Sequence, residues 1–402
     1  MRFGPVRLIS PSSRWHQQTV FLELEERGVE KVYLAQEEAR AELSPGWVDI
    51  GTWTWQPQTA PAESIQQALE RAKRGGITHV FLGGWHGWHD PALLAQIRHE
   101  TQYSGVYVHL LAAWADETNR IAPIESLRAE GAFGWSLPPL RYIPWDTLDK
   151  AIPYIRYVGG PLFLLPYWEG ASGETGVPET PELALSGWKG IPPYAETVAI
   201  HAIAALYRRH GGRIIVGPIT TAEGAQLTQQ YGIPAFTAIS YVAAHAENLL
   251  GYDPVWKLHP PLRSSQDQQV LCSALEHSSI LLASWDMNPP PEEKLLEWSA
   301  ASVGHPTLGI LAPIAASLLQ RALGEQQGLS SLVKVLAELP RHLFGLGPST
   351  VQEGYPLDFT VFRVTQRQKA LPAPWSSYRT DLEVLGTIRC LADAYNLQNQ
   401  ML

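Results

Sequence analysis

The chain has 402 residues, of which 45% are hydrophobic and 17% are charged. This composition excludes a disordered protein and a coiled coil, and the net charge of −9 excludes a basic face built to bind nucleic acid. Only two cysteines occur, Cys272 and Cys390, so neither a disulfide scaffold nor a four-cysteine zinc site is expected. No apolar run reaches bilayer length and the N-terminus lacks a signal-peptide core. We therefore expect a cytoplasmic protein without a membrane partner.

Short apolar runs alternate with stretches of helical spacing along the middle of the chain. The apolar runs are typical of buried parallel strands and occupy residues 47–50, 80–82, 106–111, 132–135, 162–165, 214–216, 236–239 and 280–283. The stretches with helical spacing include residues 62–74, 91–100, 195–209, 222–231 and 265–277. Repeated strand-and-helix units predict an α/β fold, a (β/α)8 TIM-type barrel over residues 47–345. A doubly wound open sheet is the structural alternative.

The two ends of the chain do not continue this rhythm. Residues 32–34 and 358–362 have the composition of strands, and the second run follows a turn-like segment. We expect residues 1–46 and 346–402 to supply the N-terminal and C-terminal halves of one small β-domain beside the barrel. Residues 169–190 form a long loop that contains Gly and Pro, and a loop of this length is usually functional or a partner contact.

Several short segments match known family motifs in order and spacing. The matching segments are residues 45–49, 75–78, 187–196, 220–224, 257–263, 293–294, 343–346 and Asp358. The nearest match, Lys-Leu-His-Pro-Pro-Leu-Arg at residues 257–263, resembles the Asn-Pro-Pro-Leu-Arg of dihydroorotases. The chain thus resembles the dihydroorotase branch of the amidohydrolase superfamily. The resemblance implies a barrel descended from metal-dependent cyclic amide hydrolases of pyrimidine biosynthesis.

The catalytic groups of that family are missing from the matching positions. Dihydroorotases act through a metal-bound water, and their ligands and a catalytic aspartate converge at the C-terminal ends of the barrel strands. At those degenerate positions this chain carries Gly51, Trp53, Pro218, Ala243 and Trp285. The side chains of glycine, tryptophan, proline and alanine are not zinc ligands. We therefore expect no metal, no zinc cofactor, no catalytic residue of the family type and no dihydroorotase turnover.

The resemblance also identifies vestiges of a substrate pocket. The residues at these substrate-binding positions are Trp55, Trp85, His259 and Arg263. Trp55 stands where the family has an arginine that grips the substrate carboxylate, and Trp85 and His259 replace asparagines. A rebuilt, metal-free hydrolase site is an alternative, with Glu169, Asp286 and His259 as weak catalytic candidates. Residual dihydroorotase activity is a further alternative.

Other histidines have simpler interpretations. His86, His89 and Asp90 suggest a local metal site, but a polar loop at the barrel mouth explains them as well. His245 lies past the lost histidine pair and is expected to be an ordinary hydrogen-bonded residue.

The 15 tryptophans are an unusual number. Those that fall at or just after predicted strand ends are Trp53, Trp55, Trp85, Trp114, Trp135, Trp168 and Trp285. Strand ends converge on one barrel mouth, so these aromatic side chains either repack a lost polar cavity or form an aromatic pocket or contact surface. If they repack it, the rings of Trp53, Trp55, Trp85 and Trp285 should pack together, whereas Trp188 in the long loop should be exposed.

We predict a catalytically inactive dihydroorotase homologue with a structural or assembly role. Dihydroorotase relatives often dimerise, and in some bacteria a degenerate relative supports aspartate carbamoyltransferase in a complex. The resemblance therefore implies a homo-oligomer, a dimer, and a protein partner such as aspartate carbamoyltransferase or an active dihydroorotase.

Overall fold

The predicted barrel is confirmed. The computed structural model describes residues 1–54, 61–171, 173–185, 187–372 and 374–401. The barrel strands are β5 (Trp47–Thr54), β6 (Ile77–Gly84), β7 (Tyr107–Ala113), β8 (Ala132–Ser136), β9 (Leu162–Leu164), β10 (Ile214–Val216), β11 (Phe236–Ala238) and β12 (Leu281–Ala283). Every residue of β5 and β6 is buried, because barrel strands are covered on both faces and leave continuous apolar runs in the sequence.

The strands close into a ring instead of leaving the two free edges of an open sheet. Strands β5 to β10 pair in parallel, in chain order, and the short β13 (Asp286–Met287) pairs in parallel with the other edge of β5. A bridge between Val216 and Ala235 joins β10 to the start of β11, and β11 pairs with β12. The ring closes where the Ser284 amide, just after β12, donates to Asp49 Oδ1 in β5 at 2.6 Å.

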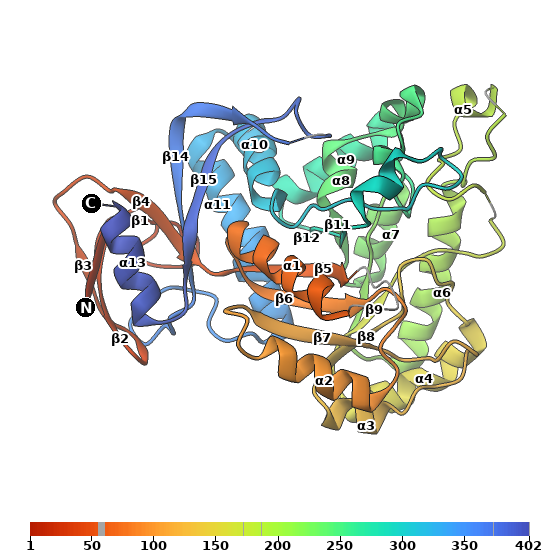
Figure 1. Cartoon of the computed structure of the whole chain (residues 1–402), viewed down its shortest axis with the longest axis horizontal. Helices are drawn as coiled ribbons and strands as arrows, with labels where there is room; N and C mark the ends of the chain where they lie inside the picture. The colour runs from red at the N-terminus through yellow and green to blue at the C-terminus, as the bar shows by residue number, and fades with distance from the viewer. Residues whose placement is uncertain (55–60, 172, 186, 373, 402) are drawn as a thin grey trace.

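Helices lie above and below the barrel strands in the view of Figure 1. They are α1 (Pro61–Arg74), α2 (Pro91–Thr101), α3 (Ile124–Ala129), α4 (Trp145–Val158), α6 (Tyr194–His210), α7 (Ala222–Tyr231), α8 (Ile239–Ala243), α9 (Ser265–Glu276), α10 (Leu311–Leu323), α11 (Glu325–Val333) and α12 (Leu339–Phe344). Local sequence sets several of their ends. Asp90 caps α2 by accepting from the Ala92 amide, and Ser264 and Asp267 form a capping box at the start of α9.

A column of aromatic rings fills the barrel from its base to its mouth. Phe344 stacks on Phe163 with 5.7 Å between ring centroids, and Phe163 lies 6.4 Å from Phe236. Phe236 lies 5.9 Å from Trp285, and the Trp285 ring lies 5.7 Å from that of Trp53. The interior is therefore packed core up to the ends of the strands.

Strands from both ends of the chain form one mixed β-sheet. Its strands are β1 (Arg2–Leu8), β2 (Thr19–Glu25), β3 (Gly28–Leu34), β4 (Ala41–Pro45), β14 (Phe359–Ala370) and β15 (Arg379–Ile388), in the order β15-β14-β4-β1-β2-β3. Most neighbours in this sheet are antiparallel, whereas β1 and β4 are parallel. A C-terminal helix, α13 (Leu391–Met401), packs on this sheet, and the Gln398 side chain bonds both backbone groups of Gly4. Both termini lie in this small domain, on the side from which the barrel strands start (Figure 1).

A buried ionic network joins the small domain to the base of the barrel. Asp358, just before β14, accepts from His79 Nε2 of β6 at 2.7 Å and from Arg341 Nη2 of α12 at 2.6 Å. Burial alone would raise the pKa of Asp358, but these two partners outweigh it and hold the pKa well below its usual range. His109 of β7 hydrogen-bonds His79 at 2.9 Å, so the network spans two barrel strands, a helix and the sheet.

The hairpin of β14 and β15 extends from the small domain over the barrel helices (Figure 1). Near its tip, the buried Trp375 packs edge-on against Trp256 at 5.1 Å and against His305 at 5.2 Å. The Tyr378 hydroxyl donates to the Ala243 carbonyl at the end of α8. In the described part of the chain, no helix is long and apolar enough to cross a membrane.

Candidate site at the barrel mouth

The strand ends leave little room for a side chain at position 51. A Cβ atom placed on Gly51 would lie 3.1 Å from the Ala283 Cβ and 3.2 Å from the Trp285 nitrogen, because β12 closes against β5 at this point. A histidine could be accommodated here only if one of the two strands moved. The position that the resemblance assigns to a metal-binding histidine is thus occupied by a backbone contact.

Trp53 and Trp285 cover the barrel centre. Their rings meet edge to face at 75°, and the side chains are only 4% and 6% exposed. The Trp53 ring lies over Gly83 of β6, where a Cβ atom would come within 2.5 Å of it. The Trp285 indole donates to the His259 carbonyl at 2.9 Å. As predicted, these two rings pack together; Trp85 is half-buried after β6, and Trp55 lies outside the described residues.

Trp285 has a backbone conformation that bulky residues rarely adopt. Its φ is +53°, in the left-handed region. This conformation directs the indole toward Trp53 and His259, and the flanking residues anchor it. The Ser284 hydroxyl donates to Asp49 Oδ2 at 2.9 Å on one side, and Asp286 pairs along β5 on the other. Packing of the ring offsets the local strain.

Asp49 is a buried carboxylate that ties the ring of strands together. It accepts from the Ser284 amide and hydroxyl, from the Thr52 hydroxyl at 2.5 Å and from the Gly51 amide at 3.3 Å. Burial raises the pKa of Asp49, and the bonds from Thr52 and Ser284 oppose that shift. Each of its oxygens is used in closing the barrel, so its role is structural.

The residues at the former ligand positions do not suit zinc. Pro218 follows β10 after a cis peptide bond and is buried, and Ala243 ends α8 with its carbonyl bonded to Tyr378. Neither side chain carries a donor atom, and the same holds for Gly51. Within the described ranges, no three His, Cys, Asp or Glu side chains come together in a way that could hold a metal ion. His89 is half-buried, and Asp90 beside it serves as the cap of α2.

Asp286 and Glu169 are not arranged as an acid/base pair. The Asp286 carboxylate is fully buried against α1, where Oδ2 accepts from Arg71 at 2.6 Å. Its Oδ1 accepts from the Thr307 and Leu308 amides at 2.6 and 2.9 Å, so both oxygens are occupied. Glu169 is exposed in the loop after β9. Asp286 lies in β13, which pairs in parallel with β5, and its carboxylate is held by Arg71 of α1, whereas Glu169 lies on a separate exposed loop.

His259 is buried beside Tyr167, with 4.9 Å between the ring centroids. Its Nδ1 has no hydrogen-bond partner, and burial together with the nearby Arg263 lowers its pKa to about 4. A neutral imidazole next to a cation can accept a hydrogen bond. A general base, in contrast, needs a pKa near the working pH, which this environment opposes.

Arg263 belongs to a polar network that sequence reasoning missed. Its guanidinium donates to the Ile191 carbonyl at 2.6 Å and to Thr220 Oγ1 at 3.3 Å. Glu196 of α6 is buried close by, and its carboxylate accepts from the amides and hydroxyls of both Thr220 and Thr221. Burial raises the pKa of Glu196, and the two threonine hydroxyls oppose the shift. The Thr-Thr pair after β10 was the one sequence feature that pointed to this network. Only the fold brings Glu196 into contact with that pair.

Two tryptophans lie differently from the sequence expectation. The Trp135 indole donates to the Gly159 carbonyl at 2.9 Å, at the C-terminal end of α4 and the base of the barrel, so this ring points away from the mouth. Trp188 is half-buried, not exposed, because it stacks on Tyr252 at 6.0 Å and contacts Trp298 edge-on at 5.5 Å.

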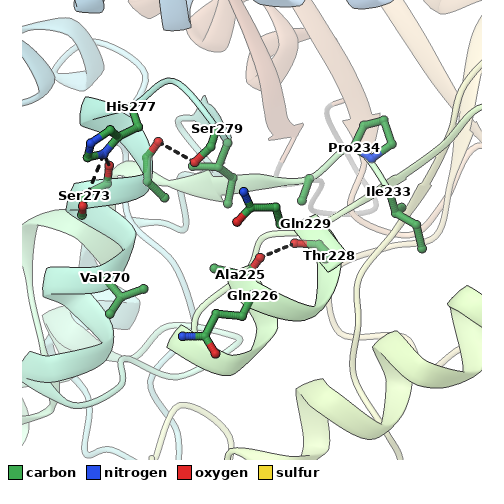
Figure 2. Close-up of a pocket in the computed structure, with 13 residues that line it drawn as sticks. Ala225, Gln226, Thr228, Gln229, Ile233, Pro234, Val270, Ser273, His277 and Ser279 are labelled. Atoms are coloured by element: carbon green, nitrogen blue, oxygen red, sulfur yellow. Dashed lines mark hydrogen bonds between the residues drawn. The ribbon is translucent and has the colours of Figure 1, made fainter. Parts of the chain in front are cut away.

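A hollow of about 470 Å³ lies at the opposite end of the barrel from Trp53 and Trp285. Figure 2 shows its lining between α7 and α9 and the segments that lead into β11 and β12, including Gln229, Ser273 and His277. His277 is engaged with its own helix, through a 2.8 Å bond between Nδ1 and the Ser273 carbonyl. Amide and hydroxyl groups predominate among the polar side chains that line the hollow, and no carboxylate lines it. It does not correspond to the mouth at which barrel enzymes carry their sites.

Solved structures share the whole architecture. The L-hydantoinase (dihydropyrimidinase) of Arthrobacter aurescens superposes with a TM-score of 0.80 at 18% identity, covering 96% of this chain and 94% of that chain. The dihydroorotase of Saccharomyces cerevisiae superposes with a TM-score of 0.64 at 10% identity, covering 86% of this chain and 98% of its own. The fold is therefore that of an amidohydrolase-type barrel joined to a small composite domain.

Sequence relatives narrow this class. A dihydroorotase of Solibacter usitatus is 23% identical over 336 residues, covering 80% of this chain and 77% of the relative. A dihydroorotase-like protein of Pseudomonas putida is 26% identical over 370 residues, covering 87% of this chain and 84% of that protein. No family model matches the sequence. The chain is therefore similar in sequence to dihydroorotases and dihydroorotase-like proteins, and similar in fold to hydantoinase and dihydroorotase structures.

Proposed function

We propose that this protein is a catalytically inactive dihydroorotase homologue that serves a structural or assembly role. The observation that carries the proposal is the packing of Trp53 and Trp285 over the aromatic column, at positions where the family binds metal and holds its catalytic aspartate. A hydrolase of this type needs a water-accessible metal site at the strand ends. Buried indole rings exclude water there and supply no ligand.

The assembly role rests on the resemblance, because in some bacteria a degenerate dihydroorotase relative supports aspartate carbamoyltransferase. We propose that the protein acts in the cytoplasm, as a homo-oligomer or with a protein partner of pyrimidine biosynthesis. Aspartate carbamoyltransferase and an active dihydroorotase are the two partners to test first. A retained barrel without its reaction is useful only if its surface contributes something, and support of a partner enzyme is such a contribution.

Metal content and turnover test the catalytic half of this proposal. The purified protein is expected to retain less than stoichiometric zinc after dialysis against zinc and to hydrolyse dihydroorotate no faster than zinc alone. An active dihydroorotase in the same buffer is the positive control. Stoichiometric zinc together with turnover above the metal-only background would overturn the proposal.

The assembly half needs a separate measurement. Aspartate carbamoyltransferase of the same organism should show a larger mass by light scattering, or a higher activity, when this protein is added. The organism's active dihydroorotase should be tested in the same way. A failure of both enzymes to respond would remove these partners.

A further inference from the structure

Three loops at the barrel mouth pack into one surface, here called the mouth rim. It comprises residues 174–185, 187–189, 247–253 and 292–298, and includes the helix α5 (Pro181–Leu185). Trp188 forms its centre by stacking on Tyr252 at 6.0 Å and meeting Trp298 edge-on at 5.5 Å. In Figure 1, α5 lies at the far end of the molecule from both termini.

Two lysines hold these loops from the inside. Lys257 Nζ donates to the carbonyls of Trp298 and Ala301 at 2.6 and 2.7 Å. Lys294 Nζ donates to the carbonyls of Ser302 and Pro254 at 2.7 and 3.1 Å. Both side-chain nitrogens are thus bound to backbone oxygens of these loops, so the lysines hold the rim together.

The outer face of the rim carries exposed apolar side chains. Leu185 is 90% exposed and Leu295 is 86% exposed. Leu250, Tyr252 and Leu296 are each about half exposed, at 48%, 45% and 47%. Leucines scattered singly on a surface are ordinary, but several on adjoining loops around a tryptophan cluster are typical of a protein-binding site.

The same loops also carry exposed acidic residues. The exposed acidic residues of the rim are Glu174, Glu179, Glu182, Glu247, Asp253, Glu292 and Glu297. In the described part of these segments, Lys189 is the exposed basic residue. Protein interfaces usually combine exposed apolar side chains with charged ones, and an excess of charge of one sign selects the opposite sign in the partner.

We propose that the mouth rim is a docking surface for a partner protein that presents apolar side chains surrounded by lysine and arginine. The excess of exposed acidic residues argues against a symmetric contact between two copies, because a two-fold interface would bring like charges together. The proposal rests on the assembly role proposed above and specifies the face that serves it. The reaction site of the ancestral fold would then have become a contact surface.

A pair of synthetic amphipathic helices tests this surface on the full-length protein. One peptide is built from leucine and lysine, and the other replaces every lysine with glutamate. The Lys/Leu peptide should bind, as followed by fluorescence anisotropy, and its affinity should fall as salt is added. The Glu/Leu peptide should bind at least about tenfold more weakly. Equal binding of the two peptides, or no binding of either, would overturn the proposal.

Matched variants locate the binding. Glu179→Gln, Glu247→Gln and Glu292→Gln combined, or Leu185→Ser with Leu295→Ser, should each weaken the Lys/Leu peptide at least about tenfold. The charge control is a triple variant of exposed residues on the small domain, Glu25→Gln, Glu26→Gln and Glu30→Gln. The apolar control is a double variant of exposed tyrosines, Tyr103→Ser and Tyr157→Ser. Controls that weaken binding as much as the rim variants would show nonspecific attraction and sink the idea.

The two proposals can fail separately. Dihydroorotate turnover with zinc would refute catalytic inactivity and leave the peptide result standing. Absence of rim-dependent peptide binding would refute the docking surface without touching the metal and turnover result.

Discussion

Removal of the Trp285 side chain is the sharpest test of the packed mouth. The ring is 6% exposed, contacts Trp53 and Phe236 at centroid distances of 5.7 and 5.9 Å, and donates to the His259 carbonyl. Replacing a buried tryptophan with alanine costs about 3–5 kcal/mol through lost burial and the remaining cavity. An unpaired buried carbonyl adds about 1–3 kcal/mol. The change to alanine does not relieve the backbone strain, because a φ of +53° is unfavourable for any residue that has a Cβ atom.

We therefore expect Trp285→Ala to lower the free energy of unfolding by about 4 kcal/mol or more, a large share of the about 5–15 kcal/mol typical of native proteins. Urea unfolding followed by circular dichroism measures the change. Trp285→Phe should lose less, because it keeps an aromatic ring and leaves a smaller cavity, although it also removes the indole hydrogen bond. Tyr157→Ala, at a side chain that is 84% exposed, is the control and should change stability by less than about 0.5 kcal/mol.

A Trp285→Ala protein as stable as the parent would refute the packed mouth. It would mean that the ring covers an open pocket, and a search for small-molecule ligands would then replace the search for protein partners. A variant that fails to fold at all agrees with the packed mouth only if Trp285→Phe folds with reduced stability.

Two further predictions concern buried charges and protons. Arg71→Met leaves the Asp286 carboxylate buried without its cation and should lower the free energy of unfolding by about 3–5 kcal/mol. The double variant Arg71→Met with Asp286→Asn should recover part of this loss. An Arg71→Met protein as stable as the parent in the same urea assay would contradict this prediction. Burial lowers the pKa of His109 to about 3 and those of His259 and His305 to about 4, from an ordinary 6.5. Below pH 6.5 the unfolded chain binds protons that the folded chain does not, so stability should fall as the pH drops toward 4, by about 1.4 kcal/mol per pH unit for each histidine. Unfolding curves at pH 7, 6 and 5 check this, and equal stability at all three would contradict it.

The small domain shows how far local pattern could reach. Residues 32–34 and 358–362 were recognisable as strands, but β1, β2, β4 and β15 were not predicted, and neither was α13. A strand in a mixed sheet with one covered face has a weaker pattern than a barrel strand buried on both faces. The order β15-β14-β4-β1-β2-β3 brings residues 2–45 beside residues 359–388, and no local signal contains that pairing.

What the sequence by itself determined was the barrel and the kinds of atoms at its mouth. Strands buried on both faces require continuous apolar runs, so their positions can be read along the chain, and a glycine or tryptophan lacks a metal-ligating group in any fold. Only the tertiary structure decided where side chains point and what they meet. Asp286 pairs with Arg71, 215 positions away, and Trp135 turns to the base of the barrel while Trp285 turns to its mouth. Direction depends on backbone conformation and on partners distant in sequence, and neither is encoded in residue type or local spacing.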